Sequence, residues 1–451
     1  MVQLPTRINV TGMGVLTAIA QTIPDFTQAL FEQKTAFGYL KRPGREGAEP
    51  FLGAELPDLD IQSKLPEHRG LLRTASWSSQ VATLALSEAW QDAKLETAIS
   101  SGIVNPERIG LVVGGSNFQQ RSQQELWQKY QSKPQFIRPT YGLTVWDTDM
   151  VGILSQCFPI RGEGYTVGCA SASGALAIIH AARQILTGET DVSIAVGALF
   201  DLSSWECQGL RNLGAMGSDK FSDRPELACR PFDQDHDGFI YGEGCGVLVL
   251  ERANLREITA EEIASADPPK SPLERGTFTT APLSKGWGDL DNCCKVHGTL
   301  LGWGLALDGN RATDPSQAGE ERAMQAALTM ANLQPEQIDY VNTHGTSSPL
   351  GDRTEAAALK GVGLSHALVN STKSLTGHCL TGAGVVEAIA TLLQLKAQRC
   401  HGTHNLIHPI DPNLNWVTEA AIPAEIKYAI SNSFAFGGMN AAIVFGHKEV
   451  K

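Results

Sequence analysis

The sequence predicts an α/β fold in which helices pack on mostly parallel sheets. Short apolar and β-branched runs, such as Leu111–Gly115 and Val192–Val196, indicate buried strands. These runs alternate with helical stretches along the whole chain. The same signals return in the C-terminal part, so we also expect an approximate duplication.

A buried helix is predicted between Ser173 and Thr187. Apolar residues recur there among alanines, at Leu176, Ile179, Ile185 and Leu186. Ser171 lies just before this helix, and strand signals follow it. If a pseudo-twofold axis relates two such halves, two helix N-termini meet at one centre. Their positive partial charge and free N–H groups suit a site where negative charge develops.

The second half repeats the arrangement. His378 lies just before a predicted helix that starts near Gly382 and runs over Val385–Leu395, and strand signals follow at Tyr428–Ser431 and Ala441–Phe445. We therefore predict an N-terminal half over residues 1–254 and a C-terminal half over 293–451. The proline-rich stretch 255–292 breaks the pattern, which favours a surface insertion or, alternatively, a partner-binding loop.

Composition excludes several classes of protein. The chain has 451 residues, of which 42% are hydrophobic, and a net charge of −12, which disfavours nucleic-acid binding. The nine cysteines are scattered and have no metal-ligand spacing, so we expect no disulfides. The N-terminus lacks the pattern of a signal peptide, and no apolar run looks long enough to cross a bilayer. We expect a cytoplasmic protein with no membrane contact.

Three blocks carry chemistry: Gly168-Cys-Ala-Ser-Ala-Ser-Gly174, Asn342-Thr-His-Gly-Thr346 and Lys373-Ser-Leu-Thr-Gly-His378. With them, the chain resembles the β-ketoacyl synthase family nearly end to end, from Val10–Val15 to Ser431–Gly438. The resemblance implies a thiolase-like fold, with duplicated βαβαβ halves in a layered α/β/α/β/α architecture. It also implies a homodimer and a substrate carried on the phosphopantetheine arm of an acyl carrier protein, with no cofactor bound by the enzyme. The acidic stretch around His236 is ordinary in the family, so we expect no metal there.

The residue at the family's nucleophilic cysteine is the main departure. Arg161-Gly162, Ser173-Gly174 and Ala181-Ala182-Arg183 fit the family register without a gap, and Ser171 then occupies the cysteine position. Cys169 falls two positions earlier, and placing it at the nucleophile position requires compensating gaps. A helix N-terminus lowers a cysteine pKa enough to supply a thiolate, whereas a serine hydroxyl needs an adjacent general base. We therefore expect acyl transfer to be crippled.

The two histidines are the strongest catalytic candidates. By the resemblance, His344 and His378 present N–H groups to the enolate oxygen that forms when a malonyl thioester loses CO2. Lys373 resembles the family's buried, site-ordering lysine, and Glu387 resembles its acidic partner. The plainer alternatives are hydrogen-bonded core histidines, a solvent-facing lysine and a glutamate on a helix surface.

Substrate contacts follow from the same resemblance. Thr346 and Ser348 correspond to hydroxyls that bind the phosphopantetheine arm, or they are ordinary turn hydroxyls. Phe239 corresponds to the aromatic residue beside the malonyl carboxylate, or it is only a core residue. Phe434 and Phe436 resemble the gating loop of an acyl pocket, where Ala435 and Met439 depart from the usual residues, although packing alone could explain these two changes.

Ser171 and its surrounding pattern look most like the ketosynthase-like decarboxylases of polyketide β-branching cassettes. The resemblance implies conversion of malonyl–acyl carrier protein to acetyl–acyl carrier protein and CO2. Three alternatives stay open. One is a condensing synthase, either through a misplaced register or with Ser171 engineered from cysteine. The others are a non-catalytic partner like a chain-length factor, and an acyltransferase or esterase with Ser171 as nucleophile.

Overall fold

A computed structural model describes residues 7–448 apart from 48, 218, 254, 257–294, 312 and 419. Its main feature is one 11-stranded sheet. In spatial order the strands are β13 (Asn415–Trp416), β11 (Leu368–Asn370), β10 (Tyr340–Asn342), β15 (Tyr428–Ala435), β16 (Met439–Gly446), β9 (Gly298–Leu307), β1 (Ile8–Thr17), β8 (Gly244–Arg252), β6 (Val192–Gly197), β4 (Ile109–Gly114) and β5 (Gly164–Val167).

The strand order contains the predicted duplication. The first half runs β5-β4-β6-β8-β1, and the second half runs β11-β10-β15-β16-β9 with β13 added at its edge. In each half the strands equivalent to β5, β4 and β6 are parallel, and the remaining two pair antiparallel. The halves join where β1 pairs with β9, with Ile8 opposite Leu300. The predicted duplicated α/β architecture is confirmed.

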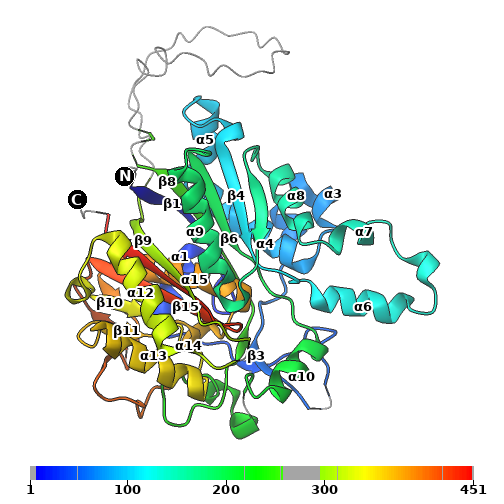
Figure 1. The fold of residues 1–451 in the computed structure, drawn as a ribbon. Helices are drawn as coiled ribbons and strands as arrows, with labels where there is room; N and C mark the ends of the chain where they lie inside the picture. Colours follow the sequence, from blue (N-terminus) through cyan, green and yellow to red (C-terminus); the bar gives the residue numbers. More distant parts are fainter. Residues whose placement is uncertain are drawn as a thin grey trace.

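Two helices fill the space between the halves. They are α9 (Ser173–Leu186) and α15 (Ala383–Ala397), which both lie in the interior (Figure 1). Their N-terminal ends touch, because a Cβ on Gly174 would lie 3.1 Å from the nitrogen of Gly384. A side chain at either glycine would push the helices apart. The two helix N-termini therefore meet at one centre, as the sequence predicted.

Further helices cover the outer faces. Helix α4 (Trp77–Asp92) packs on β1 and β8, and α12 (Gln317–Ala331) packs on β9 and β16 beside α13 (Pro349–Val362). Among the described residues, the remaining α-helices and strands are α1 (Ile23–Phe31), α2 (Ile61–Lys64), α3 (Arg69–Leu72), α5 (Leu95–Ser100), α6 (Gln120–Tyr130), α7 (Tyr141–Thr144), α8 (Thr148–Cys157), α10 (Ser204–Asn212), α14 (Lys373–Thr376), β2 (Gly38–Tyr39), β3 (Leu52–Ala54), β7 (Tyr241–Gly242), β12 (Arg399–Cys400) and β14 (Ile422–Pro423).

Two sequence predictions need comment. The stretch Leu380–Ala397 is long and apolar enough to cross a bilayer, so the expectation that no run would qualify was wrong. However, 83% of that stretch is buried inside the protein, and most of it forms the central helix α15. The predicted insertion 255–292 lies outside the described residues except at 255 and 256, and the boundaries at 254 and 293 stay predictions.

Candidate active site

A sharp turn after β5 exposes Ser171 to a cavity. Ala170 has φ +42°, in the left-handed region that a Cβ disfavours. The hydroxyl of Ser173 stabilises the turn, because it donates to the Ala170 carbonyl at 2.7 Å and accepts the Cys169 N–H at 2.9 Å. Residues 170–172 form a 3-10 turn that leads directly into α9. Ser171 thus lies at the N-terminal end of the central helix.

The structure separates Ser171 from Cys169 clearly. The Ser171 Oγ lies 2.9 Å from Nε2 of His378 and lines the cavity. The Cys169 side chain is only 6% exposed, and its thiol donates to the Met439 Sδ at 3.3 Å. Burial raises the pKa of Cys169 to about 11, so its thiol is protonated near neutral pH. The side chain that faces the histidine is a hydroxyl.

His378 is held by its main chain and by one ring nitrogen. Its N–H donates to the Ile240 carbonyl at 2.7 Å, and its carbonyl accepts the Gly242 N–H at 3.1 Å. The Leu380 N–H donates to Nδ1 of the ring at 3.3 Å. Because Nδ1 accepts, a neutral ring carries its proton on Nε2. The Nε2–H therefore donates to the hydroxyl oxygen of Ser171.

His344 completes the pair of imidazoles. The two ring centroids lie 5.4 Å apart at an interplanar angle of 84°. The main-chain N–H groups of His344 and Gly345 each donate to the Glu355 carboxylate at 2.8 Å. Burial, followed by the charge of Lys373, lowers the pKa of both histidines well below the usual value. Both rings are therefore neutral N–H donors near pH 7.

Lys373 and Glu387 form a buried ion pair beside the histidines. The relative exposures of their side chains are 0% and 2%. Burial raises the pKa of Glu387 to about 7, although the Lys373 ammonium opposes the shift. These positions exclude the plainer alternatives of a solvent-facing lysine and a surface glutamate.

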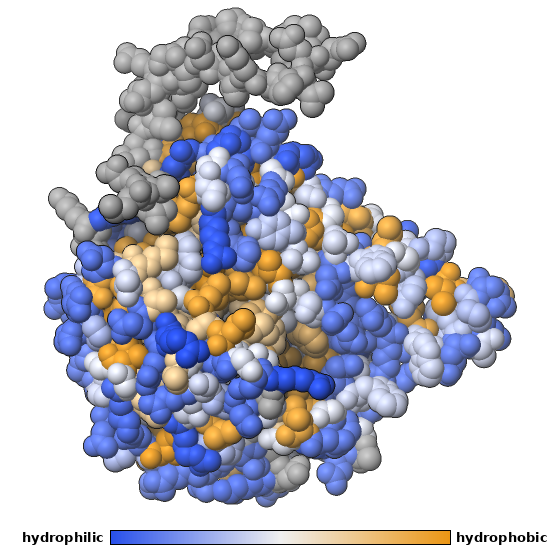
Figure 2. Space-filling model, in the orientation of Figure 1, coloured by the Kyte–Doolittle hydropathy of each residue, from blue (hydrophilic) through white to orange (hydrophobic). Residues whose placement is uncertain are grey.

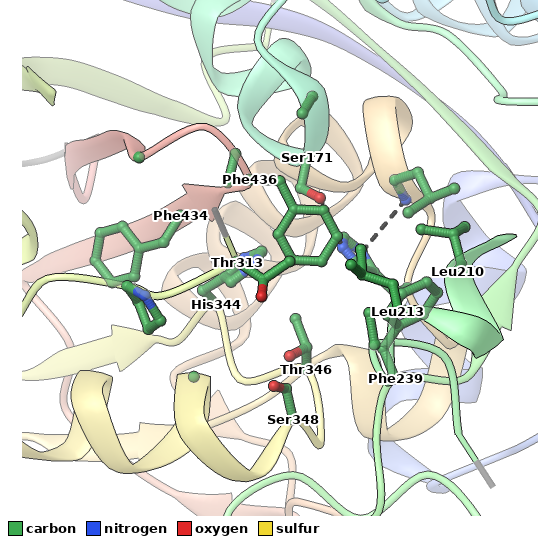
Figure 3. Close-up of a pocket in the computed structure, with 18 of the residues that line it drawn as sticks. Ser171, Leu210, Leu213, Phe239, Thr313, His344, Thr346, Ser348, Phe434 and Phe436 are labelled. Atoms are coloured by element: carbon green, nitrogen blue, oxygen red, sulfur yellow. Dashed lines mark hydrogen bonds between the residues drawn. The ribbon is translucent and has the colours of Figure 1, made fainter. Parts of the chain in front are cut away.

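Aromatic side chains cover the histidines. Phe239 meets His378 edge-on, with ring centroids 5.3 Å apart at 85°. Phe434 lies 6.0 Å from His344 at 60°. Phe436 is 38% exposed and, like the other two, lines the cavity (Figure 3). The structure thus brings all three predicted phenylalanines to one site.

The predicted phosphopantetheine hydroxyls lie in the same cavity, which has a volume of about 410 Å³. Figure 3 shows Thr346 and Ser348 together on the side of the cavity opposite Ser171. The Thr346 N–H donates to Asp352 Oδ1 at 3.1 Å, which fixes the loop. Ser348 immediately precedes α13. Leu210 of α10 and Leu213, which follows this helix, line another part of the wall.

Sequence reasoning missed two acidic residues that shape the site, Asp352 and Glu355. Both are buried on α13. Asp352 accepts the N–H of Phe232 at 2.7 Å and also contacts Nδ1 of His236 at 3.1 Å. The available signal was a pair of acidic residues three positions apart among apolar residues, because buried carboxylates require hydrogen-bond partners.

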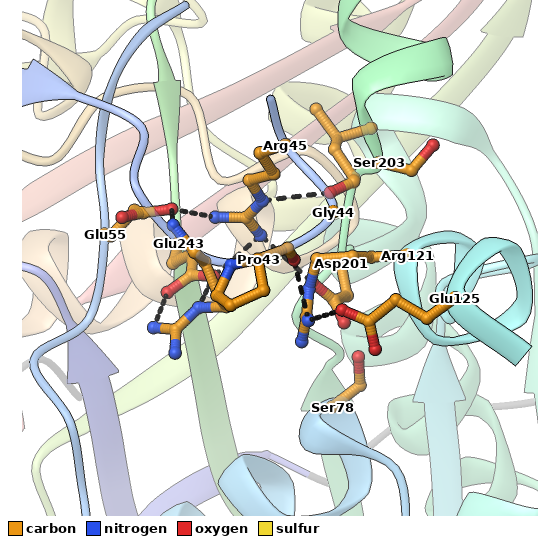
Figure 4. Close-up of polar contacts among 12 residues, drawn as sticks. Pro43, Gly44, Arg45, Glu55, Ser78, Arg121, Glu125, Asp201, Ser203 and Glu243 are labelled. Carbon is orange, nitrogen blue, oxygen red and sulfur yellow. Dashed lines mark hydrogen bonds and ion pairs between the residues drawn. The ribbon is translucent and has the colours of Figure 1, made fainter. Parts of the chain in front are cut away.

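A buried ionic network also went unpredicted (Figure 4). Arg45 donates to Asp201 Oδ1 at 3.0 Å, to Glu243 Oε1 at 2.7 Å and to the Leu202 carbonyl at 2.9 Å. Leu202 lines the cavity, and Glu243 follows β7, in which Tyr241 forms a β-bridge with His378. The network therefore connects one wall of the cavity to the segment that holds the main chain of His378.

The chain belongs to the β-ketoacyl synthase family. The family's N-terminal domain matches residues 6–255, and its C-terminal domain matches residues 297–407. The resemblance inferred from the sequence motifs and the thiolase-like fold are confirmed.

Two named relatives are similar to this chain over nearly its whole length. The chain is 48% identical over 437 residues to "Polyketide biosynthesis malonyl-ACP decarboxylase PksF" of Bacillus subtilis strain 168, covering 97% of this chain and 95% of that protein. It is 30% identical to 3-oxoacyl-[acyl-carrier-protein] synthase 2 of Vibrio harveyi, covering 97% and 98%.

Solved structures agree on the fold. A β-ketoacyl synthase from Burkholderia phymatum STM815 superposes with a TM-score of 0.82 at 27% identity, covering 99% of this chain and 100% of that one. The ishigamide ketosynthase/chain length factor gives 0.81 at 24% identity, covering 98% and 99%.

Proposed function

We propose that this protein converts malonyl–acyl carrier protein to acetyl–acyl carrier protein and CO2 in polyketide β-branching, without condensation. One observation carries the proposal: a hydroxyl, not a thiol, occupies the turn before α9, facing an intact pair of neutral imidazoles. The similarity to the relative named as a malonyl-ACP decarboxylase supports the same activity.

The histidines stabilise the charge that develops during decarboxylation. The carbonyl oxygen of the malonyl thioester accepts hydrogen bonds from the N–H groups of His344 and His378. It thereby replaces Ser171 Oγ as the acceptor of the Nε2–H of His378. Breaking the bond between C2 and the carboxyl carbon releases CO2 and places the electron pair in an enolate. Each preorganised donor to such an oxygen is typically worth about 2.7–4 kcal/mol.

Phe239 favours loss of the carboxylate. Its ring is 3% exposed and packs edge-on against His378. An apolar wall stabilises neutral CO2 better than the anion that precedes it. A water molecule then protonates C2 of the enolate to give the acetyl group.

Ser171 lacks a base that would make it a nucleophile. An acyl-serine intermediate requires a general base to remove the hydroxyl proton. Nε2 of His378 carries a proton and donates it toward Ser171, because the Leu380 N–H occupies Nδ1. This geometry argues against both the esterase or acyltransferase and the condensing synthase. The two histidines and the buried Lys373–Glu387 pair argue against a non-catalytic chain-length factor.

We propose an acyl carrier protein as the macromolecular partner, with Thr346 and Ser348 contacting its phosphopantetheine arm. The enzyme binds no cofactor or metal of its own in this mechanism. Solved relatives include a type II polyketide acyl-carrier protein in complex with its ketosynthase, a 21% identical structure that supports the fold alone. A cytoplasmic location is part of the same proposal.

We further propose a homodimer. Among the described residues, β5 is an edge strand of the large sheet, so one side of its backbone is unpaired there. The projecting segment from α6 to the start of α8 carries exposed apolar side chains (Figure 2). Trp127 and Leu143 are each 64% exposed, and Trp146 is 65% exposed. Light scattering on the pure protein tests this state, and a monomer at micromolar concentration contradicts it.

The activity is tested by incubating the pure protein with malonyl–acyl carrier protein alone. Mass spectrometry of the carrier should detect the loss of CO2 and the appearance of acetyl groups. Adding an acyl–carrier protein donor should give no β-ketoacyl product. A condensation product, or a stable acyl group on Ser171, would overturn the proposal.

A further inference from the structure

Two sulfur-containing side chains, Cys169 and Met439, touch each other across the halves of the fold. Cys169 precedes the turn that carries Ser171, and Met439 begins β16. The Cys169 thiol donates to Met439 Sδ at 3.3 Å, and both sulfur atoms belong to residues remote in sequence. Because burial keeps the thiol protonated, its hydrogen remains available for this contact.

Met439 adjoins the turn that covers the cavity. Ala435, Phe436 and Gly438 of this turn line the cavity, as does Ser171. Gly437 and Gly438 have φ values of +85° and +69°, which glycine adopts without strain. The turn therefore has the backbone freedom to swing, unless contacts on its two sides hold it.

The far side of the turn is held by Asp308. Its N–H donates to the Gly438 carbonyl at 2.8 Å, and its Oδ1 accepts from Asn440 at 2.7 Å. A Cβ on Gly438 would lie 2.7 Å from the Cβ of Asp308, so the two segments are in close contact. Cys169 holds the opposite side through Met439. The turn is thus tethered both to the second half and to the turn that presents Ser171.

We propose that the Cys169–Met439 contact is a specificity-determining latch that keeps this turn closed and excludes acyl groups longer than the malonyl and acetyl units. The inference deepens the proposed decarboxylation and rests on it. On this proposal a malonyl group is accepted with the turn closed, and a longer chain is accepted only when Phe436, which lines the cavity, moves with the turn. The latch therefore acts on chain length, separately from the chemistry of Ser171.

The test uses the Ser171→Cys variant as a reporter. Its introduced thiolate attacks the carbonyl of an acyl-pantetheine, a new carbon–sulfur bond forms, and the pantetheine thiol leaves with a proton. Intact-protein mass spectrometry gives the rates with acetyl- and octanoyl-pantetheine. The ratio of the two rates cancels changes in the reactivity of the thiol.

Adding Met439→Ala or Cys169→Ala should raise the octanoyl-to-acetyl ratio about threefold, the change in open population expected when one weak hydrogen bond is lost. The two changes together should do no more than either alone, since they remove one contact. Met439→Leu keeps most of the side-chain volume but lacks the sulfur that accepts the hydrogen bond, so it should behave like Met439→Ala. Agreement between the two variants shows that the change in ratio does not come from misfolding. Cys400→Ala, at another buried cysteine, should leave the ratio unchanged.

An unchanged ratio in all three latch variants, or strictly additive effects, overturns the latch. Decarboxylation of malonyl–acyl carrier protein by the otherwise unaltered enzyme is measured in parallel. Failure there contradicts the proposed function, whereas normal decarboxylation with an unchanged ratio contradicts the latch alone.

Discussion

Nε2 of His378 lies 2.9 Å from the Ser171 hydroxyl oxygen, and the N–H of Leu380 occupies the other nitrogen of the ring. The direction of the hydrogen bond is thereby fixed, with imidazole as donor and hydroxyl as acceptor. In a hydrolase dyad the roles are reversed, because the imidazole removes the serine proton. Ser171 and His378 are therefore hydrogen-bonded, but they do not act as a nucleophile and its general base.

Replacing Ser171 with alanine should therefore preserve decarboxylation. The hydroxyl contributes one hydrogen bond, whose loss changes the rate by about tenfold at most. The measurement is release of CO2 from labelled malonyl–acyl carrier protein. A fall of more than a thousandfold would show that the hydroxyl takes part in bond making.

Replacing His344 with alanine should lower kcat by about 10²–10³, the usual effect of losing one oxyanion donor. KM should change much less, because the donor acts mainly on charge that develops in the transition state. The exposed His366 provides the matched control, and His366→Ala should retain full activity. A raised KM with an unchanged kcat would instead indicate a role in substrate binding.

Lys373→Met should destabilise the protein by about 3–5 kcal/mol, because Glu387 is left buried without its cation. The double variant Lys373→Met/Glu387→Leu should recover most of this loss, since no uncompensated charge remains. Urea unfolding of the single and double variants measures the coupling. Additive losses in the double variant would contradict the pairing.

Glu355 should make stability depend on pH. Burial raises its pKa from 4.5 to about 7, so between these values the folded state holds a proton that the unfolded state lacks. Its stabilising contribution is complete below pH 4.5 and is lost as the pH rises through 7. Relative to Glu355→Gln, the wild type should lose about 3 kcal/mol of unfolding free energy from pH 4 to 8. Urea titrations across this range provide the check, and a constant difference would refute the shift.

Much of the fold and site followed from sequence patterns. The helix predicted between Ser173 and Thr187 is α9, and the strand predicted at Val192–Val196 is β6. Such elements are predictable because apolar periodicity is a local property of the chain. Ser171, His344 and His378 were found because each lies in an ordered block of neighbouring residues, and the structure brings all three to one cavity.

The supporting contacts were not predictable in the same way. Glu355 holds the main chain of His344, and Arg45 joins Asp201 and Glu243, which lie 156 and 198 residues away in sequence. No local pattern encodes such pairings. They arise when buried charges find partners during packing, because an unpaired charge in the interior is costly.

The sequence by itself determined the α/β duplication and the identity of the side chains at the reacting centre. Both follow from local features of the chain, namely apolar periodicity and short motifs of consecutive residues. Only the tertiary structure decided which nitrogen of His378 bears the proton and where the Cys169 thiol points. Both depend on the partners each atom meets in the folded interior, Leu380 in one case and Met439 in the other.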